Sequence, residues 1–244
     1  MQAGSGKLAR ARHVLAGTER TWCEAGREVG PDRRWTASFS LAAIDKHLSM
    51  GGINAPSLHE VHGGVGNGAA SGFVLWLARL ALVQMPGPVF WIKAPTGGDH
   101  DALYPPALED GVRDKMIMIE ARQRRDVLWA FEEILNSGQA ACVIAETDHM
   151  DLTAARRLQL ASENGHSLAI ALCQSSPDTK AGNSVARTRW RVATRQDGWS
   201  LELLGGRGVR PGEWKVKRDA TTLSLHLVSA SGDRPVSDHH PVAA

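Results

Sequence analysis

The sequence predicts an α/β protein with a mainly parallel sheet flanked by helices and an antiparallel extension near its C-terminus. From Leu58 to Cys173, short apolar runs of strand length alternate with helical segments, an order that is typical of parallel sheets. After Cys173, polar and apolar residues alternate and turn-rich segments join the runs, which indicates antiparallel strands. With 244 residues, 43% of them hydrophobic, the chain can form one large domain.

Several segments are predicted to be helices: 6–19, 41–48, 69–84, 126–136 and 151–164. The segment 69–84 is apolar on nearly all sides and is stopped by Pro86, so we expect a buried helix. The last helix should begin at the N-cap Asp151 and end at Gly165. The runs predicted to be strands are 58–61, 89–92, 115–119, 140–145, 167–173, 188–193, 200–204, 214–218 and 223–228.

The chain is expected to have three parts. Residues 1–35 are basic and polar and contain the first helix, and residues 36–228 form the α/β domain. Residues 229–244 have few apolar side chains to bury and are expected to be disordered. Within the domain, the stretch 174–185 is rich in Ser, Asp, Gly and Asn and is expected to be a mobile loop.

Composition argues against several classes of protein. The three cysteines lie far apart without a C-x-x-C pair, so neither a disulfide framework nor a metal site is expected. The histidines, among them His59 and His62, lack the spacing of a zinc site, and we expect them at the surface or in caps. No signal peptide and no apolar run long enough to cross a bilayer are found, which predicts a cytoplasmic protein without a membrane partner.

The segment around Gly63 and Gly68 has the layout of a phosphate-binding loop, with a strand before it and a helix start after it. In a working loop, G-x-x-x-x-G-K-[ST], backbone N–H groups surround the phosphates, the Lys neutralises them and the hydroxyl holds Mg²⁺. Here Ala69 stands in place of the Lys and Ala70 in place of the Ser or Thr. We therefore expect no catalysis and no cofactor, although backbone amides alone still permit weak phosphate binding.

One carboxylate, Glu146, directly follows a predicted strand, where a Walker B acid would hold Mg²⁺ through water. A structural or solvated Glu is the commoner case for so short a motif, and hydrolysis here lacks the Lys, the hydroxyl and a second carboxylate. We interpret the following residues as remnants of a nucleotide site: Gly63, Gly68, Ala69, Ala70 and Glu146.

Positive charge collects late in the chain, where residues 187–218 hold nine Lys or Arg against three Asp or Glu. The candidate residues for binding single-stranded DNA are Arg187, Arg189, Arg191, Arg207 and Arg210. The first three alternate along one predicted strand and should share a face, with Trp190 opposite. A solvated basic edge that prevents strand-to-strand aggregation, with the Trp side chains in the core, explains the same pattern about equally well.

Together these features resemble the RecA-like ATPase core and, more closely, the inducible-mutagenesis protein A (ImuA) family of bacteria, a degenerate RecA-like group. The resemblance covers about residues 38–220. It is carried by Ile44–Leu48, Leu58–Val61, Asp151–Ala161, Thr188–Val192, Leu203-Leu204 with Arg207-Gly208, and Pro211–Trp214. The loss of the loop Lys agrees with that family and departs from true RecA.

The resemblance implies a RecA-like fold and a role in the DNA-damage (SOS) response. Such proteins act with a catalytically inactive Y-family polymerase homologue and an error-prone replicative-type polymerase in mutagenic translesion synthesis. RecA and single-stranded DNA are further candidate partners. The prediction is therefore a non-enzymatic adaptor. The alternative is an active RecA-like DNA-dependent ATPase with an unusual loop, and Ala69 and Ala70 favour the adaptor.

Overall fold

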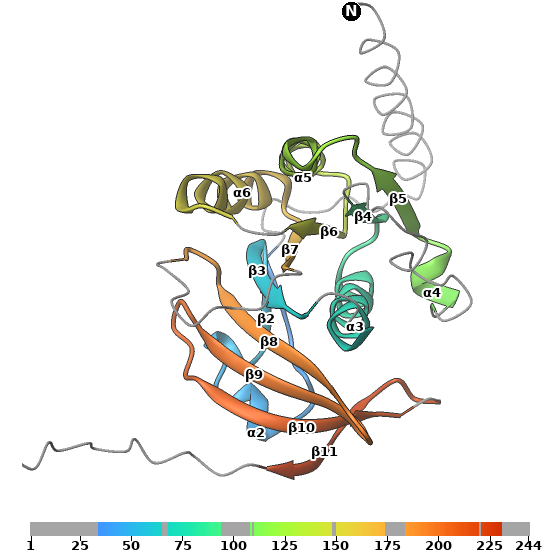
Figure 1. The fold of residues 1–244 in the computed structure, drawn as a ribbon, viewed down its shortest axis with the longest axis vertical. Helices are drawn as coiled ribbons and strands as arrows, with labels where there is room; N and C mark the ends of the chain where they lie inside the picture. Colours follow the sequence, from blue (N-terminus) through green and yellow to red (C-terminus); the bar gives the residue numbers. More distant parts are fainter. Residues whose placement is uncertain are drawn as a thin grey trace, which may run out of the picture.

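The computed structural model describes residues 34–64, 68–93, 108, 110–147, 150–173, 184–219 and 221–230, and the structural findings concern these residues. Their main feature is one sheet with the strand order β11-β10-β9-β8-β3-β7-β6-β4-β5 (Figure 1). The strands are β3 (Ser57–His62), β4 (Val89–Lys93), β5 (Met116–Glu120), β6 (Cys142–Thr147), β7 (Leu168–Cys173), β8 (Thr188–Arg195), β9 (Gly198–Gly206), β10 (Gly212–Arg218) and β11 (Leu225–Ala230).

The sheet has a parallel and an antiparallel part, which confirms the predicted fold class. From β5 across to β8, every neighbouring pair of strands is parallel. From β8 to β11, every pair is antiparallel. The inner strand β7 is buried at every residue, as expected for a parallel strand that is covered on both faces.

Helices cover both faces of the parallel part (Figure 1). On one face, α3 (Gly68–Gln84) packs in a core with the Trp residues of β8 and β10. On the other face, α5 (Arg124–Ser137) and α6 (Leu152–Gly165) form a second core with β4, β6 and β7. A short helix, α4 (Asp110–Arg113), precedes β5. None of the helices in the described ranges combines the length and apolarity needed to cross a membrane.

The segment predicted as a helix over 41–48 is only partly helical. The structure has α2 (Ala42–Asp45) followed by a 3₁₀ turn, Ser49–Gly51. The carboxylate of Asp45 accepts hydrogen bonds from the backbone N–H groups of Phe39 (2.8 Å) and Leu41 (3.1 Å), which fixes the entry to the helix. An antiparallel pair that was not predicted, β1 (Trp35–Ala37) with β2 (Ile53–Ala55), encloses this segment.

The two ends of α6 lie at the predicted residues. Asp151 is the N-cap, since its Oδ1 accepts from the backbone N–H of Ala154 at 2.7 Å. The helix ends at Gly165 as predicted, but Gly165 is its last helical residue, and the left-handed C-cap is His166 (φ 57°). A Cβ on Gly165 would lie 1.6 Å from the carbonyl oxygen of Leu135, so glycine is required there for the close approach of α5.

Strand β11 reaches Ala230, two residues beyond the predicted end of the domain. The predicted helix 6–19, most of the loop 174–185 and the tail beyond 230 lie outside the described residues.

Candidate functional site

The strand and the helix that were predicted to flank a phosphate loop are present. Strand β3 lies between β7 and β8, parallel to both, and α3 begins at Gly68. Residues 65–67, between them, are not described. A Cβ on Gly63 would lie 2.3 Å from the Cβ of Ala70, so the chain turns back against the start of α3 where no side chain fits.

The alanines that replace the Lys and the hydroxyl are part of the core. Ala69 is 4% exposed and Ala70 is 2% exposed, and both belong to the cluster that packs α3 against the sheet. In a working loop the corresponding side chains reach the ligand. Here both positions contribute methyl groups to the interior, where a longer side chain would have to displace neighbouring core atoms.

Glu146 lies at the carboxyl end of β6, where it was predicted. Its Oε1 accepts a hydrogen bond from Nε1 of Trp91 at 2.6 Å, and Trp91 is buried. A buried indole N–H needs a partner, and Glu146 supplies it. This contact gives Glu146 a structural role in joining β6 to β4.

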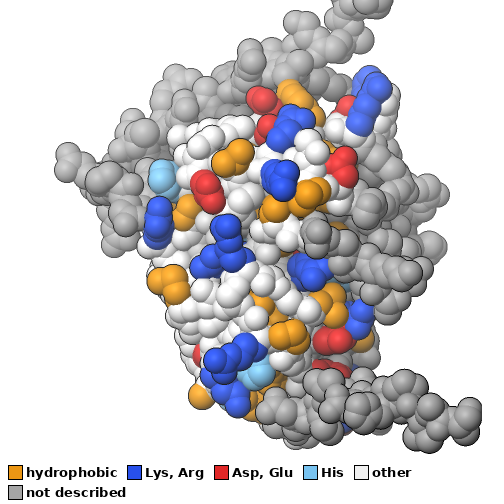
Figure 2. Space-filling view, turned by 90° about the vertical axis from the view of Figure 1, so that its left-hand side faces the viewer, with side chains coloured by type: hydrophobic (Ala, Val, Ile, Leu, Met, Phe, Trp, Pro, Cys, Tyr) orange, Lys and Arg blue, Asp and Glu red, His pale blue; other side chains and the backbone are white. Residues whose placement is uncertain are grey.

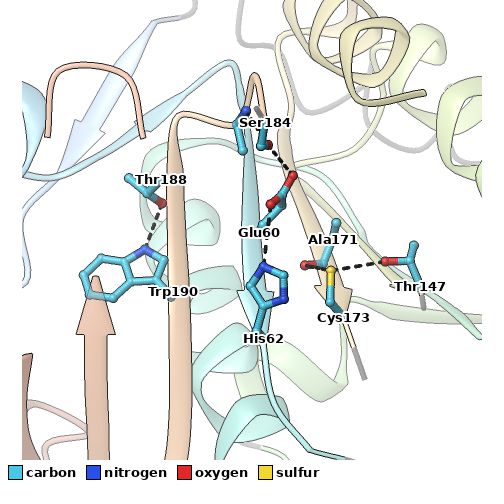
Figure 3. A network of polar contacts seen from close by, with 9 residues as sticks. Glu60, His62, Thr147, Ala171, Cys173, Ser184, Thr188 and Trp190 are labelled. Carbon is cyan, nitrogen blue, oxygen red and sulfur yellow. Dashed lines mark hydrogen bonds and ion pairs between the residues drawn. The ribbon is translucent and has the colours of Figure 1, made fainter. Parts of the chain in front are cut away.

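A polar network that sequence reasoning missed lies beside the loop, at the carboxyl ends of β3 and β7 (Figure 3). The Ser184 hydroxyl donates to Oε1 of Glu60 at 2.5 Å, and Oε2 of Glu60 lies 3.6 Å from Nε2 of His62. On β7, Cys173 is in register with His62, and its Sγ lies 3.5 Å from the Thr147 hydroxyl. The polar groups at this edge therefore largely satisfy one another.

The two histidines of β3 titrate in opposite directions. Burial lowers the pKa of His59 to about 4. Burial also acts to lower the pKa of His62, but the contacts with the Cys173 thiol and the Glu60 carboxylate outweigh it and raise that pKa to about 9. At neutral pH, His59 is uncharged and His62 is an imidazolium beside Glu60.

The expectation that the histidines lie at the surface is wrong for His59, which is fully buried. Its Nδ1 lies 2.7 Å from the Thr188 hydroxyl, and its Nε2 lies 2.9 Å from the backbone oxygen of Asn54. The Thr188 hydroxyl also accepts from Nε1 of Trp190 at 2.8 Å (Figure 3). The carbonyl oxygen of Asn54 can only accept, so Nε2 of the neutral ring carries the proton and donates to it. Nδ1 therefore accepts a hydrogen bond from the Thr188 hydroxyl. This chain of bonds ties β8 to β3 and β2.

The predicted alternation along β8 is confirmed. Arg189 and Arg191 are half-buried, whereas Trp190 between them is fully buried on the opposite face. Trp214 of β10 is also buried, so these indoles stabilise the core. Arg191 forms an ion pair with Glu202 of β9, with Nη1 and Oε2 2.5 Å apart.

The other candidate DNA-binding residues lie outside β8. Arg187 precedes the strand, and its Nη2 donates to the Ser49 hydroxyl at 3.0 Å. Arg207 and Arg210 are exposed in the turn that follows β9. In the side view of Figure 2, basic side chains form several separate groups rather than one continuous stripe.

Two segments that carry the family resemblance contact each other. Nδ1 of His47 lies 3.0 Å from the carbonyl oxygen of Arg210 and 3.2 Å from that of Pro211. The His47 ring meets Trp214 edge-on, with centroids 5.0 Å apart. A Cβ on Gly212 would lie 2.6 Å from the Trp214 ring. These motif residues therefore hold the segment after α2 against β10, which is a structural role.

Comparison with known proteins gives one informative similarity. No protein-family model matches the chain. Two proteins named protein ImuA, from the NA1000 / CB15N and the ATCC 19089 / CIP 103742 / CB 15 strains of Caulobacter vibrioides, are 29% identical to it over 227 residues. The alignments cover 82% of this chain and 91% of theirs.

Among solved structures, SulA from Pseudomonas aeruginosa matches 49% of this chain and 98% of its own, with 17% identity and a TM-score of 0.39. This structural likeness is too low to carry a functional argument. The two ImuA sequences confirm the resemblance to the ImuA family that the sequence motifs indicated.

Proposed function

We propose that this protein is a non-enzymatic accessory factor in SOS-induced mutagenic translesion DNA synthesis. The similarity to ImuA supports a part in the mutagenesis system. The observation that carries the non-enzymatic part is the burial of Ala69 and Ala70 in the core. Phosphoryl transfer depends on charge stabilisation by a cation and a held metal ion, and neither alanine can supply it.

The protein acts, in this proposal, by binding other proteins. Its partners are the inactive Y-family polymerase homologue and the error-prone replicative-type polymerase, with RecA as a third candidate. Large apolar side chains are exposed on the helical layer formed by α5 and α6, notably Trp129 (48%) and Leu160 (59%). Exposed aromatic side chains are favoured anchors in protein interfaces, so this layer is the first surface to test.

Contact with single-stranded DNA is a secondary part of the proposal. Arg207 and Arg210 are exposed and can reach phosphates. Arg191 is paired with Glu202, and Arg187 is half-buried, so both are less open to a DNA strand than the exposed turn. We therefore place any DNA contact at the turn after β9, and we expect it to be weak and independent of sequence.

Hydrolysis by the purified protein tests the non-enzymatic assignment. We expect no phosphate release from ATP above background, with or without single-stranded DNA. Gly68→Asp is the matched control, because its side chain enters open space and its charge repels phosphate at the start of α3. Phosphate release that scales with protein concentration and disappears in Gly68→Asp would support the ATPase alternative instead.

The accessory role is tested in damage-treated cells. We expect the tagged chain to co-purify with the inactive polymerase homologue, as identified by mass spectrometry, and its deletion to lower damage-induced mutation frequency. Gly68→Asp should restore mutagenesis fully, whereas Trp129→Ala should restore it only in part. A folded Gly68→Asp variant that fails to restore mutagenesis would show that the loop still serves the function.

A further inference from the structure

A cavity of about 450 Å³ lies at the opposite end of the parallel strands from the phosphate loop. Its walls come from the β1–β2 pair, the start of β3, the end of α6, the segment before β8 and the turn after β9. Ser57, the first residue of β3, and His166, the C-cap of α6, mark this amino end of the sheet. The volume is that of a small-molecule site.

Four of the residues that line this cavity each carry a buried polar atom without a hydrogen-bond partner within the described residues: Trp35 Nε1, Asn54 Oδ1, His166 Nδ1 and Arg187 Nε. These residues come from four separate elements and all line the one cavity. Asn54 is only 7% exposed, and its Nδ2 donates to the Thr36 hydroxyl at 2.9 Å, which leaves Oδ1 as an unused acceptor. Buried polar atoms are normally paired, so four unpaired ones on residues around one cavity indicate a missing ligand.

The charge of the lining defines the sign of that ligand. Three arginines, Arg34, Arg187 and Arg207, face one acidic residue, Glu163. The Glu163 carboxylate already accepts from Nε2 of Gln159 at 2.8 Å. The arginines of the lining therefore exceed its acidic residue by two positive charges. Guanidinium groups bind phosphate oxygens through paired N–H donors, and a doubly charged phosphate would balance the excess.

We propose that this cavity binds a small organic phosphate. The phosphate group lies against the guanidinium groups of Arg187 and Arg207 and accepts from the free N–H groups of the lining. A hydroxyl or amine elsewhere on the ligand donates to Oδ1 of Asn54. The site is separate from the phosphate loop and does not depend on the accessory role proposed above.

Calorimetric titration of the full chain tests the site, with ribose 5-phosphate as the probe and ribose, inorganic phosphate and citrate as comparison compounds. We expect one binding site for ribose 5-phosphate, at least fivefold weaker binding of inorganic phosphate, and no heat from ribose. Citrate that binds more tightly than either phosphate would overturn the phosphate assignment. Absence of binding by all of these compounds would mean that water satisfies the lining atoms.

Variants locate the site. Arg187→Gln should weaken ribose 5-phosphate binding at least tenfold, and Arg207→Gln, at an exposed position that cannot disturb the fold, several-fold. Arg191→Gln makes the same charge change on the face of β8 and should leave the affinity unchanged. Gly68→Asp should also leave it unchanged. Loss of binding in Gly68→Asp, or equal losses in Arg191→Gln and Arg207→Gln, would refute the cavity as the binding site.

Discussion

The two ends of the parallel strands differ in how fully their buried polar groups are hydrogen-bonded. At the carboxyl end, where doubly wound sheets hold ligands, Trp91 is paired with Glu146, and Glu60 with Ser184 and His62. At the amino end, four residues that line one cavity each carry a buried polar atom without a hydrogen-bond partner among the described residues. An unpaired buried polar group is costly. At the carboxyl end only His62 Nε2 lacks a hydrogen bond among the described residues, and it lies 3.6 Å from the Glu60 carboxylate, whereas the four atoms at the amino end need a ligand or water.

The dependence of stability on pH tests the shifted pKa values of two histidines of β3, His59 and His62. The folded pKa of His59 is lowered to about 4, so the unfolded chain takes up a proton first. Stability is therefore lost as the pH falls from about 6.5 to about 4, by ~3 kcal/mol in full. The folded pKa of His62 is raised to about 9, so its contribution is present below about 6.5 and is lost as the pH rises to 9.

Chemical denaturation at several pH values measures both the loss of stability toward acid pH (the acid limb) and the loss toward alkaline pH (the alkaline limb). We expect the free energy of unfolding to be highest near pH 6.5. His62→Gln should flatten the alkaline limb and leave the acid limb in place. An alkaline limb that is unchanged in this variant would show that the ion pair with Glu60 contributes nothing to stability.

A pair of identical substitutions compares the two ends directly. Trp91→Phe deletes an N–H that is bound to Glu146 and leaves the half-buried carboxylate without that donor, so we expect a loss of about 1–3 kcal/mol. Trp35→Phe deletes an N–H that has no partner, so we expect a change within about 0.5 kcal/mol.

Urea denaturation of the two variants measures the difference. Both substitutions remove the same ring atoms, from a buried side chain at Trp91 and a half-buried one at Trp35. Equal losses would mean that the Trp35 N–H is satisfied as well as that of Trp91, and the contrast between the two ends would fail.

The smallest expected effect concerns single-stranded DNA. Replacement of Arg207 and Arg210 by Ala should lower any DNA affinity equally for all sequences, because the contacts are to phosphates. Each lost contact should reduce the slope of log K against log salt by about 0.7. Fluorescence anisotropy at several salt concentrations measures this. If the double variant binds DNA with an unchanged slope, the contact lies elsewhere, and the predicted basic segment 1–35 becomes the next region to test.

Local pattern in the sequence was sufficient for most of the fold. The buried strands, the helix α3 after the glycine loop and the N-cap at Asp151 were all predicted, because each depends on residues that are close in the sequence. The opposite faces of Arg189 and Trp190 follow from the period of two in a strand. The spacing of Gly63 and Gly68 with alanines after them was also visible without the structure.

Tertiary contacts decided the rest. The helix predicted over 41–48 stops early, and His47 instead bonds to carbonyl groups of Arg210 and Pro211. Gly165, the last residue of α6, also permits the close approach of α5, and His59 is buried by partners from β2 and β8. Each of these depends on residues far away in the chain, which periodicity does not report.

The sequence alone determined the absence of the Lys and the hydroxyl from the glycine loop, since that is a matter of which residues stand at fixed spacing. Only the tertiary structure decided that Ala69 and Ala70 are in the core and that Glu146 binds an indole. It also brought Arg34 and Arg207 to one cavity at the other end of the sheet. The physical reason is that pairing and burial of polar groups are set by strand order and helix packing, which bring distant residues together.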